Sequence, residues 1–454
     1  MSGGPILAFA LGVSLIGAAG WVSWRKPTVL LAVALASLAV RPQLFLGGPA
    51  VGYDWGLHHT LLLLALVANA LHFGLRRTMY WPVAALLAAS ALSLGAGDLH
   101  PKLTLGFMVM SLGVFVLPWC CTSVILEPGS RRALALVIML TPLLSVVIGA
   151  LMTAAGIRSS FLQWHRLEGA TGNAAAFAVL AFAGFAVALH EMSRPARPFA
   201  GALAVINLAL VILSGTRMAI AAVGVFLIAY LLLSETLRQR LLEHRARTAV
   251  GVGVVAATLL WYWPTLEFRM FEQGNDVETV SIGAADVSVN LSGRADIWEF
   301  YFEEFTFSPL FGRGIGAGFV AAADWLPWTR KTPHNEYLHL LVSVGAIGFV
   351  VCAAAIAFWY RRLLQMASDN DRPFLIALIP AIGLFAITED VLVFSTGLAL
   401  FAYLGVLLTK RSAKATFPHA RKRHRGRSSR TAGRERVAHT PRDDTEGEPG
   451  TGAA

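Results

Sequence analysis

Long apolar runs recur along almost the whole chain, and they constrain its fold more than any other feature of the sequence. Of the 454 residues, 56% are hydrophobic and 14% are charged, whereas a soluble domain carries about 25% charged residues. A helix needs about 20 apolar residues to cross the roughly 30 Å hydrocarbon core of a bilayer. The sequence therefore predicts an all-α polytopic membrane protein.

We expect about 12 or 13 transmembrane helices. The run at 28–40 is short, so it could be a half-span or could include flanking residues. The predicted spans are residues 5–24, 28–40, 57–74, 79–95, 104–126, 133–157, 173–192, 199–213, 218–233, 249–264, 336–359, 374–388 and 391–409.

Basic residues predict how these spans are oriented, because cytoplasmic loops carry an excess of Lys and Arg. Links rich in these residues alternate with links that are poorer in them. Placing the basic set in the cytoplasm puts the long segment 265–335 outside. The basic links contain Arg25/Lys26, Arg76/Arg77, Arg131/Arg132, Arg194/Arg197, Arg238 to Arg247 and Arg361/Arg362.

The chain is expected to be a multi-pass protein of the cytoplasmic (inner) membrane with four parts. Residues 1–264 hold the first ten spans, 265–335 form a large periplasmic (extracytoplasmic) loop with short helices, 336–409 hold the C-terminal spans, and 410–454 form a basic, disordered cytoplasmic tail. The loop has ten acidic and five basic residues, as expected for a translocated segment. The tail has twelve Lys/Arg and five Asp/Glu, and so supplies seven of the net charge of +10. Because its bases have no interleaved aromatic residues, we expect contact with anionic lipid and not with nucleic acid.

The three cysteines, Cys120, Cys121 and Cys352, all fall in apolar spans. They form neither a disulfide framework nor a CxxC metal pair.

Polar residues gather on the predicted external links. The link 158–172, "RSSFLQWHRLEGATG", contains Arg158, His165, Arg166 and Glu168, and it leads into Asn173. The segment "SGTR" at 214–217 interrupts an apolar stretch that is too long for one span. We expect Ser214-Gly215 to break the helix, with Ser214 capping the next one. The free amides of that helix start and Arg217 beside them would form an anion site, although a snorkelling arginine gives the same pattern.

The segment "SGRADIW" repeats this arrangement in the long loop. Ser292 and Gly293 precede an expected amphipathic helix at about 294–307, with Arg294 in its first turn. An arginine is unfavourable at the positive end of a helix, so its presence suggests an anionic ligand; a surface salt bridge is the alternative. In "GRGIGAGF", the glycines at 314, 316 and 318 lack the Gly-Lys-Ser/Thr of a phosphate-binding loop. They predict a tight turn and close backbone approach.

His334 stands at the predicted external end of the span 336–359. Pro333 stops any preceding helix, and Asn335 or His334 can begin the next one. Glu336 and His339 do not share a helical face with His334, so a metal site is not expected. A neutral imidazole in a half-wet pocket beside arginines suits a general base, and an interfacial side chain without chemistry is the alternative.

Taken together, these segments resemble the O-antigen ligase family and its relatives, the O-antigen polymerases and O-oligosaccharyltransferases. The family signature is His, then Asn/Ser/Gln, nine residues, Gly, two residues, and Gly/Thr/Tyr. Here it is His334, Asn335, Gly345 and Gly348. The resemblance extends to "SGTR", "SGRADIW…PLFGRGIGAGF" and "RLEGATGN", and covers roughly residues 160–410. Many members have Asn-Pro-Asn where this chain has Gly172-Asn173-Ala174.

The resemblance implies metal-independent glycosyl transfer from undecaprenyl diphosphate to an acceptor hydroxyl outside the cytoplasmic membrane, without a cofactor. In this interpretation His334 is the catalytic base or orients the acceptor, and Arg217 and Arg294 bind the donor diphosphate. We add Arg166 as a third candidate for the diphosphate, Asn335, Ser214, Gly215, Gly345 and Gly348 as supporting residues, and Arg158, Arg313 and Glu336 as weaker candidates.

The acceptor is not defined by these motifs. O-antigen ligation to lipid A-core in lipopolysaccharide biosynthesis is the first hypothesis, followed by a polymerase of O-antigen or exopolysaccharide and then by a protein O-oligosaccharyltransferase. A polysaccharide transporter or flippase would be expected to keep charged residues near the bilayer midplane and to show repeat symmetry. Here the key residues gather at one face, and no repeat is visible in the sequence.

Overall fold

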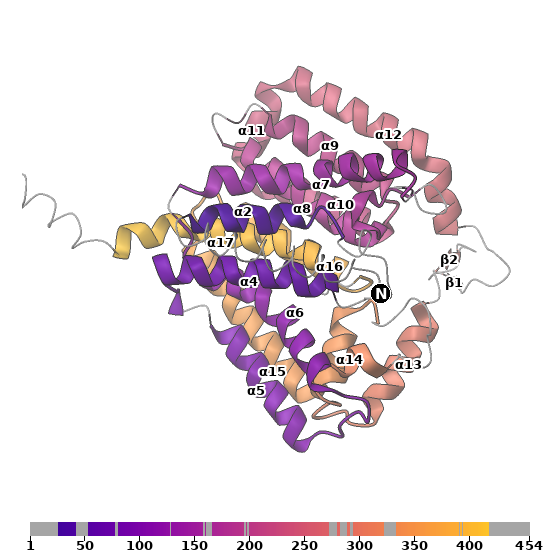
Figure 1. Ribbon diagram of the computed structural model, residues 1–454. Coiled ribbons are helices and arrows are strands. Elements are labelled where there is room, and N and C mark those ends of the chain that lie inside the picture. The colour runs from indigo at the N-terminus through magenta and orange to yellow at the C-terminus, as the bar shows by residue number, and fades with distance from the viewer. Residues whose placement is uncertain are drawn as a thin grey trace, which may run out of the picture. The chain divides into compact units, whose positions relative to one another are not determined.

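The computed structural model describes residues 26–41, 53–77, 80–127, 129–157, 159, 166–194, 197, 199–271, 279–281, 288–290, 294–321, 333–389, 391–392 and 394–416. Within these ranges the chain is almost entirely helical (Figure 1). The helices are α2 (Pro27–Ser37), α4 (Tyr53–Phe73), α5 (Trp81–Ala96), α6 (Leu105–Ser123), α7 (Arg131–Ala154), η3 (Gly169–Thr171), α8 (Ala174–Met192), α9 (Ala200–Leu213), α10 (Arg217–Leu233), α11 (Glu235–Glu243), α12 (Arg245–Phe271), α13 (Arg294–Thr306), α14 (Ala317–Val320), α15 (Glu336–Met366), α16 (Arg372–Phe385), η5 (Ser395–Gly397) and α17 (Leu398–Thr416). Strands β1 (Thr279–Ser281) and β2 (Ser288–Asn290) pair antiparallel.

Each predicted span within the described ranges falls on a helix, and the chain is an all-α polytopic membrane protein. Among the described residues, five helices are long and apolar enough to cross a membrane, namely α6, α7, α8, α12 and α15. Helices α10 and α11 form one further candidate span that bends by 93° at Ser234. The shorter apolar helices are α2, α4, α5, α9, α16 and the segment 395–408. The predicted span 5–24 lies outside the described residues, and the helix predicted at 249–264 extends to Phe271.

Helix α8 forms the centre of the main hydrophobic core. Its side chains are buried along nearly its whole length, and it packs against α7 and α9. Helix α10 packs along α16 and also contacts α8. Each of α8, α10 and α16 is one uninterrupted helix through this core. The two ends of each helix therefore lie at a fixed distance from each other.

Helix α15 is broken at Gly345, where φ is 68° and ψ is −179°. The loop that follows α13 fills the break: the amide of Ala346 donates to the carbonyl of Pro309 (2.8 Å), and that of Ile347 to Leu310 (3.1 Å). The amide of Arg313 donates in turn to the carbonyl of Val342 (2.8 Å). The break therefore locks the loop at 309–313 into α15. Cys120, Cys121 and Cys352 lie in α6 and α15 and are unpaired.

Candidate functional site

Three arginines from three separate segments approach one another. Arg166 lies before α8, Arg217 is the first residue of α10, and Arg294 is the first residue of α13; all three are half-buried. Arg217 interacts electrostatically with Arg166 and Arg294, and Arg166 with Arg294. The repulsion among three guanidinium groups favours the binding of an anion at this place.

A carboxylate missed by the sequence reasoning lies among these arginines. Nη2 of Arg294 donates to Oε1 of Glu389 over 2.6 Å, and the Glu389 side chain is only 7% exposed. Arg166 and Arg217 also interact electrostatically with Glu389. The only sequence signal for Glu389 was its position at the predicted external end of the run 374–388.

Arg166 is attached to the break between α9 and α10. Its Nε donates to the carbonyl of Ser214 (3.1 Å), and its Nη2 to Oγ1 of Thr216 (3.2 Å). Burial lowers the pKa of Arg166 and the nearby Arg294 lowers it further, whereas the charge of Glu389 opposes this change. A bound anion would relieve this electrostatic cost.

The predicted break between α9 and α10 is confirmed, but the predicted capping residue is wrong. Gly215 has a φ of 61°, and Ser214 ends α9 as its C-cap. The N-cap of α10 is Thr216, whose side chain makes no capping hydrogen bond. Ser214 Oγ instead accepts from the amide of Thr216 (3.2 Å) and donates to the carbonyl of Val211 (2.6 Å). The left-handed turn at Gly215 moves the helix start two residues along the chain, so Ser214 cannot cap it.

His334 immediately precedes the start of α15 and is half-buried. Its φ is 47°, the only positive value among the described residues other than glycine. Asn335 is the N-cap of α15, and its Oδ1 accepts from the amide of Leu338 (3.0 Å). Nε1 of Trp298, in α13, donates to the carbonyl of Pro333 (2.9 Å). The residues around His334 are thus fixed by a cap on one side and by α13 on the other.

The end of α16 and the residues after it contact both the start of α15 and the arginine cluster. The amide of Glu336 donates to the carbonyl of Ala386 (3.0 Å), and Oη of Tyr337 to the carbonyl of Gly383 (2.9 Å). Glu389, which holds Arg294, follows Ala386 by three residues. The starts of α13 and α15 are therefore both attached to the same short segment, 383–389.

The weaker candidates have other contacts. The buried Glu336 accepts the amide of Leu392 at its Oε1 (2.6 Å). Arg313 pairs with Glu304 (3.2 Å) and lies over the ring of Phe307 (4.5 Å to its centroid), so it belongs to a different cluster. Arg158 lies outside the described residues.

The two motif glycines allow close backbone approach. A Cβ at Gly345 would lie 2.4 Å from the carbonyl oxygen of Leu310, and one at Gly348 would lie 3.2 Å from the Cβ of Ala89 in α5. Gly314 and Gly316 also have positive φ, as expected for a tight turn. His339 is buried against Phe319, with 4.5 Å between ring centroids. Among the described residues, no three His, Cys, Asp or Glu side chains lie together in an arrangement that could hold a metal.

The fold and the cluster define a helical membrane protein in which three arginines approach one another. Comparison with known families gives a match over one part of the chain: residues 202–353 match the O-antigen ligase family, in agreement with the resemblance seen in the sequence. The match contains Arg217, Arg294, His334, Gly345 and Gly348, whereas Arg166 and Glu389 lie outside it. It supports glycosyl transfer of the ligase or polymerase kind. A comparison with curated proteins gives no match.

Proposed function

We propose that the protein transfers a glycan from undecaprenyl diphosphate to an acceptor hydroxyl at the extracytoplasmic face of the inner membrane, and that the acceptor is lipid A-core. The observation that carries this proposal is the approach of Arg166, in the link before α8, and Arg294, at the start of α13, to Arg217 at the start of the candidate membrane helix α10. A lipid diphosphate carries its charge at the headgroup plane, and a guanidinium group binds phosphate oxygens through two parallel hydrogen bonds.

The arginines act on the leaving group in this proposal. As the bond between the anomeric carbon and the phosphate oxygen breaks, its electron pair stays with undecaprenyl diphosphate, whose negative charge grows. Preorganised cations stabilise this charge more in the transition state than in the ground state. Glu389 holds Arg294 in place before the donor arrives.

His334 acts on the acceptor. Its imidazole accepts the proton of the attacking hydroxyl, whose oxygen forms the new bond to the anomeric carbon. Attack on the face opposite the diphosphate inverts that carbon. One positioned base contributes about 10²–10⁴-fold to such a rate, and no metal ion is needed for any of these steps.

The direct test is a reaction with purified protein in detergent, in EDTA and without ATP. Undecaprenyl-diphosphate-linked glycan is supplied with and without lipid A-core, and the products are analysed by gel ladder and mass. Glycan on lipid A-core only when that acceptor is present supports ligation. Longer chains on the undecaprenyl carrier without it would instead indicate a polymerase, and the absence of any product would contradict glycosyl transfer.

Two variants test the residue assignments in the same reaction. His334→Ala and Arg217→Ala are expected to abolish transfer while the protein still inserts and accumulates. Arg361→Ala is the matched control, because Arg361 is exposed at the opposite end of α15. Wild-type turnover in either of the first two variants would overturn the assignment of the site.

A further inference from the structure

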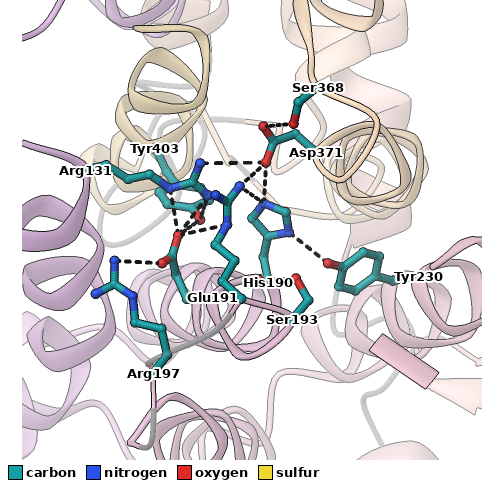
Figure 2. Close-up of polar contacts among 10 residues, drawn as sticks. Arg131, His190, Glu191, Ser193, Arg197, Tyr230, Ser368, Asp371 and Tyr403 are labelled. Carbon is teal, nitrogen blue, oxygen red and sulfur yellow. Dashed lines mark hydrogen bonds and ion pairs between the residues drawn. The ribbon is translucent and has the colours of Figure 1, made fainter. Parts of the chain in front are cut away.

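A second polar cluster lies at the ends of α8, α10 and α16 that are remote from the arginine site (Figure 2). It combines charged, imidazole and phenol groups from four helices and from the two links that follow α8 and precede α16. We call it the far-end network; its members are Arg131, His190, Glu191, Ser193, Arg194, Arg197, Tyr230, Ser368, Asp371 and Tyr403.

His190 is the fully buried centre of this network. Its Nδ1 lies 2.8 Å from Oη of Tyr230 in α10, and its Nε2 lies 3.0 Å from Oδ1 of Asp371 at the start of α16. A neutral ring satisfies both contacts when Tyr230 donates to Nδ1 and the Nε2 hydrogen is donated to Asp371. One side chain of α8 thus joins α10 to α16.

Asp371 is held from several sides. Arg194 donates to its Oδ1, Ser368 Oγ donates to its Oδ2 (2.5 Å), and Nη1 of Arg131 lies 3.7 Å from Oδ1. Asp371 occupies the N-cap position of α16, yet its carboxylate makes no capping hydrogen bond. An aspartate at this position normally caps the helix, so its carboxylate serves the network in place of the helix amides.

Glu191 is the second carboxylate of the far-end network. It pairs with Arg131 (2.8 Å) and Arg197 (3.2 Å) and accepts a hydrogen bond from Tyr403 in α17 (2.6 Å). Three arginines therefore surround two largely buried acids. Charges buried in a membrane protein are costly, and ionisable groups there often serve a function.

Two of the helices that meet in this network, α10 and α16, lead to the arginine site at their other ends. Helix α10 begins at Arg217 and holds Tyr230 near its other end, and α16 runs from Asp371 towards Glu389. The 14 residues of α16 span about 21 Å at 1.5 Å per residue. At the site end, α8 and α10 are joined by the hydrogen bond from Thr216 Oγ1 to the carbonyl of Ala174 (3.3 Å).

A series of ring contacts, stacked at His190 and edge-to-face or tilted beyond it, runs between the two ends. Phe374 stacks on His190, with 4.4 Å between centroids, and contacts Phe226 of α10 at 5.8 Å. Phe226 contacts Phe182 of α8 at 5.9 Å, and Phe182 contacts Phe385 at 6.5 Å. Phe385 ends α16 and directly precedes the residue that accepts the amide of Glu336. Close-packed rings transmit a displacement of one helix to the next.

We propose that Asp371 and His190 are positioning residues for the arginine site: the far-end network fixes how α16 lies against α8 and α10, and thereby places Glu389 and Arg217 around the donor diphosphate. This inference rests on the proposed function, because it assigns the diphosphate to that site. The network contacts no substrate itself. It acts on the position of the arginines and not on proton transfer at His334, which precedes α15.

The test compares Asp371→Asn with Asp369→Asn in the purified protein. Asp371→Asn keeps the side chain's shape and removes its charge from the network. Asp369, two positions away, is the matched control. Its side chain is 92% exposed and pairs with Arg372 (3.4 Å). Two quantities are measured for each: the Kd for undecaprenyl diphosphate and the donor KM in the transfer reaction.

We expect Asp371→Asn to raise both constants about tenfold, with an unchanged acceptor KM and an unchanged pH profile of kcat. Asp369→Asn should match the wild type. A merely structural role would reduce the amount of folded enzyme and so the maximal rate, but not these constants. A Kd and donor KM within about twofold of the wild-type values would overturn the proposal.

Tyr230→Phe decides the matter if Asp371→Asn does not accumulate. It removes only the hydroxyl on His190 and should raise the Kd for undecaprenyl diphosphate about threefold; an unchanged Kd would overturn the proposal. The binding measurement also separates the two inferences. If the wild type binds undecaprenyl diphosphate but transfers nothing, the proposed function fails while the comparison of variants remains decisive. Absence of binding by the wild type would overturn both.

Discussion

Arg294 and Glu389, 95 positions apart in the chain, form a 2.6 Å charge-assisted hydrogen bond between the start of α13 and the segment after α16. The bond explains how a positive side chain is retained at a helix N-terminus, where the helix dipole opposes it. It also places one carboxylate where three guanidinium groups meet. The site is thus held together before any ligand binds.

Glu389→Gln is expected to lower kcat/KM for the donor about tenfold. The amide still accepts a hydrogen bond from Arg294, but without the charge that makes the present bond strong, and such bonds contribute about 1.5–3 kcal/mol. Glu389→Asp should fall between glutamine and wild type, because it restores the charge at a shorter reach. Steady-state kinetics with varied donor concentration measures the effect, and an unchanged kcat/KM in the glutamine variant would contradict the role of Glu389.

Arg217→Lys tests whether the site needs a guanidinium group or only a charge. Lysine keeps the positive charge but lacks the planar fork that binds two phosphate oxygens. We expect kcat/KM to fall about tenfold with lysine, between wild type and the inactive alanine variant. Equal activity of Arg217→Lys and wild type would argue against bidentate binding of the diphosphate.

Arg313→Gln provides a contrast within the same structure. Its partner is Glu304, and the two side chains are only 8% and 13% exposed. Removing one member of such a pair costs about 3 kcal/mol, so we expect a lower unfolding temperature in detergent. The donor KM of the remaining folded protein should not change. A raised donor KM would instead indicate that Arg313 takes part in donor binding.

Sequence patterns located the helices and the break between α9 and α10 well, because the length of an apolar run and the position of a glycine are local properties; the break of α15 at Gly345 was not predicted. The break at Gly215 and the start of α13 at Arg294 were both visible in this way. Glu389 was not, because its role depends on a contact across 95 positions that no local pattern encodes. The capping residue of α10 was misplaced because the turn geometry at Gly215 decides where the helix begins.

The far-end network shows a second limit of sequence reasoning. Arg131, Arg194 and Arg197 were interpreted only as bases that orient the spans. In the structure they surround Glu191 and Asp371, and their side chains are at most 20% exposed. The excess of Lys and Arg in cytoplasmic loops is a count of residues. It is the same whether an arginine is exposed or is buried in an ion pair, so it does not distinguish the two.

Gly345→Ala should destabilise the protein strongly. The backbone at Gly345 lies in a region of φ and ψ that only glycine adopts at low cost, and a Cβ would meet the Leu310 carbonyl at 2.4 Å. A strained residue of this kind costs about 1–3 kcal/mol before the clash is included. The control is Gly224→Ala in α10, where nothing lies within 4 Å of the added carbon. A Tm of Gly345→Ala in detergent equal to that of the control would contradict this account of the motif glycine.

The pH dependence of stability is expected to reveal Asp371. Burial raises the pKa of its carboxyl, but the hydrogen bond from His190, the charge of Arg194 and the hydrogen bond from Ser368 together hold it well below the ordinary value of 3.8. In the interval below 3.8 the unfolded chain binds a proton that the folded protein does not, so stability falls as pH falls. Above this interval the stabilisation is fully present.

Thermal unfolding in detergent from about pH 7 to about pH 3 measures this dependence. The wild type should lose stability at the acid end, by at most about 1.4 kcal/mol for each pH unit below the unfolded pKa of 3.8. Asp371→Asn should start from a lower Tm and fall less steeply, because it has no carboxyl to protonate, while the exposed Asp369→Asn should follow the wild-type curve. Parallel curves for Asp371→Asn and wild type would mean that Asp371 is not held as an anion by His190 and Arg194 in the folded protein.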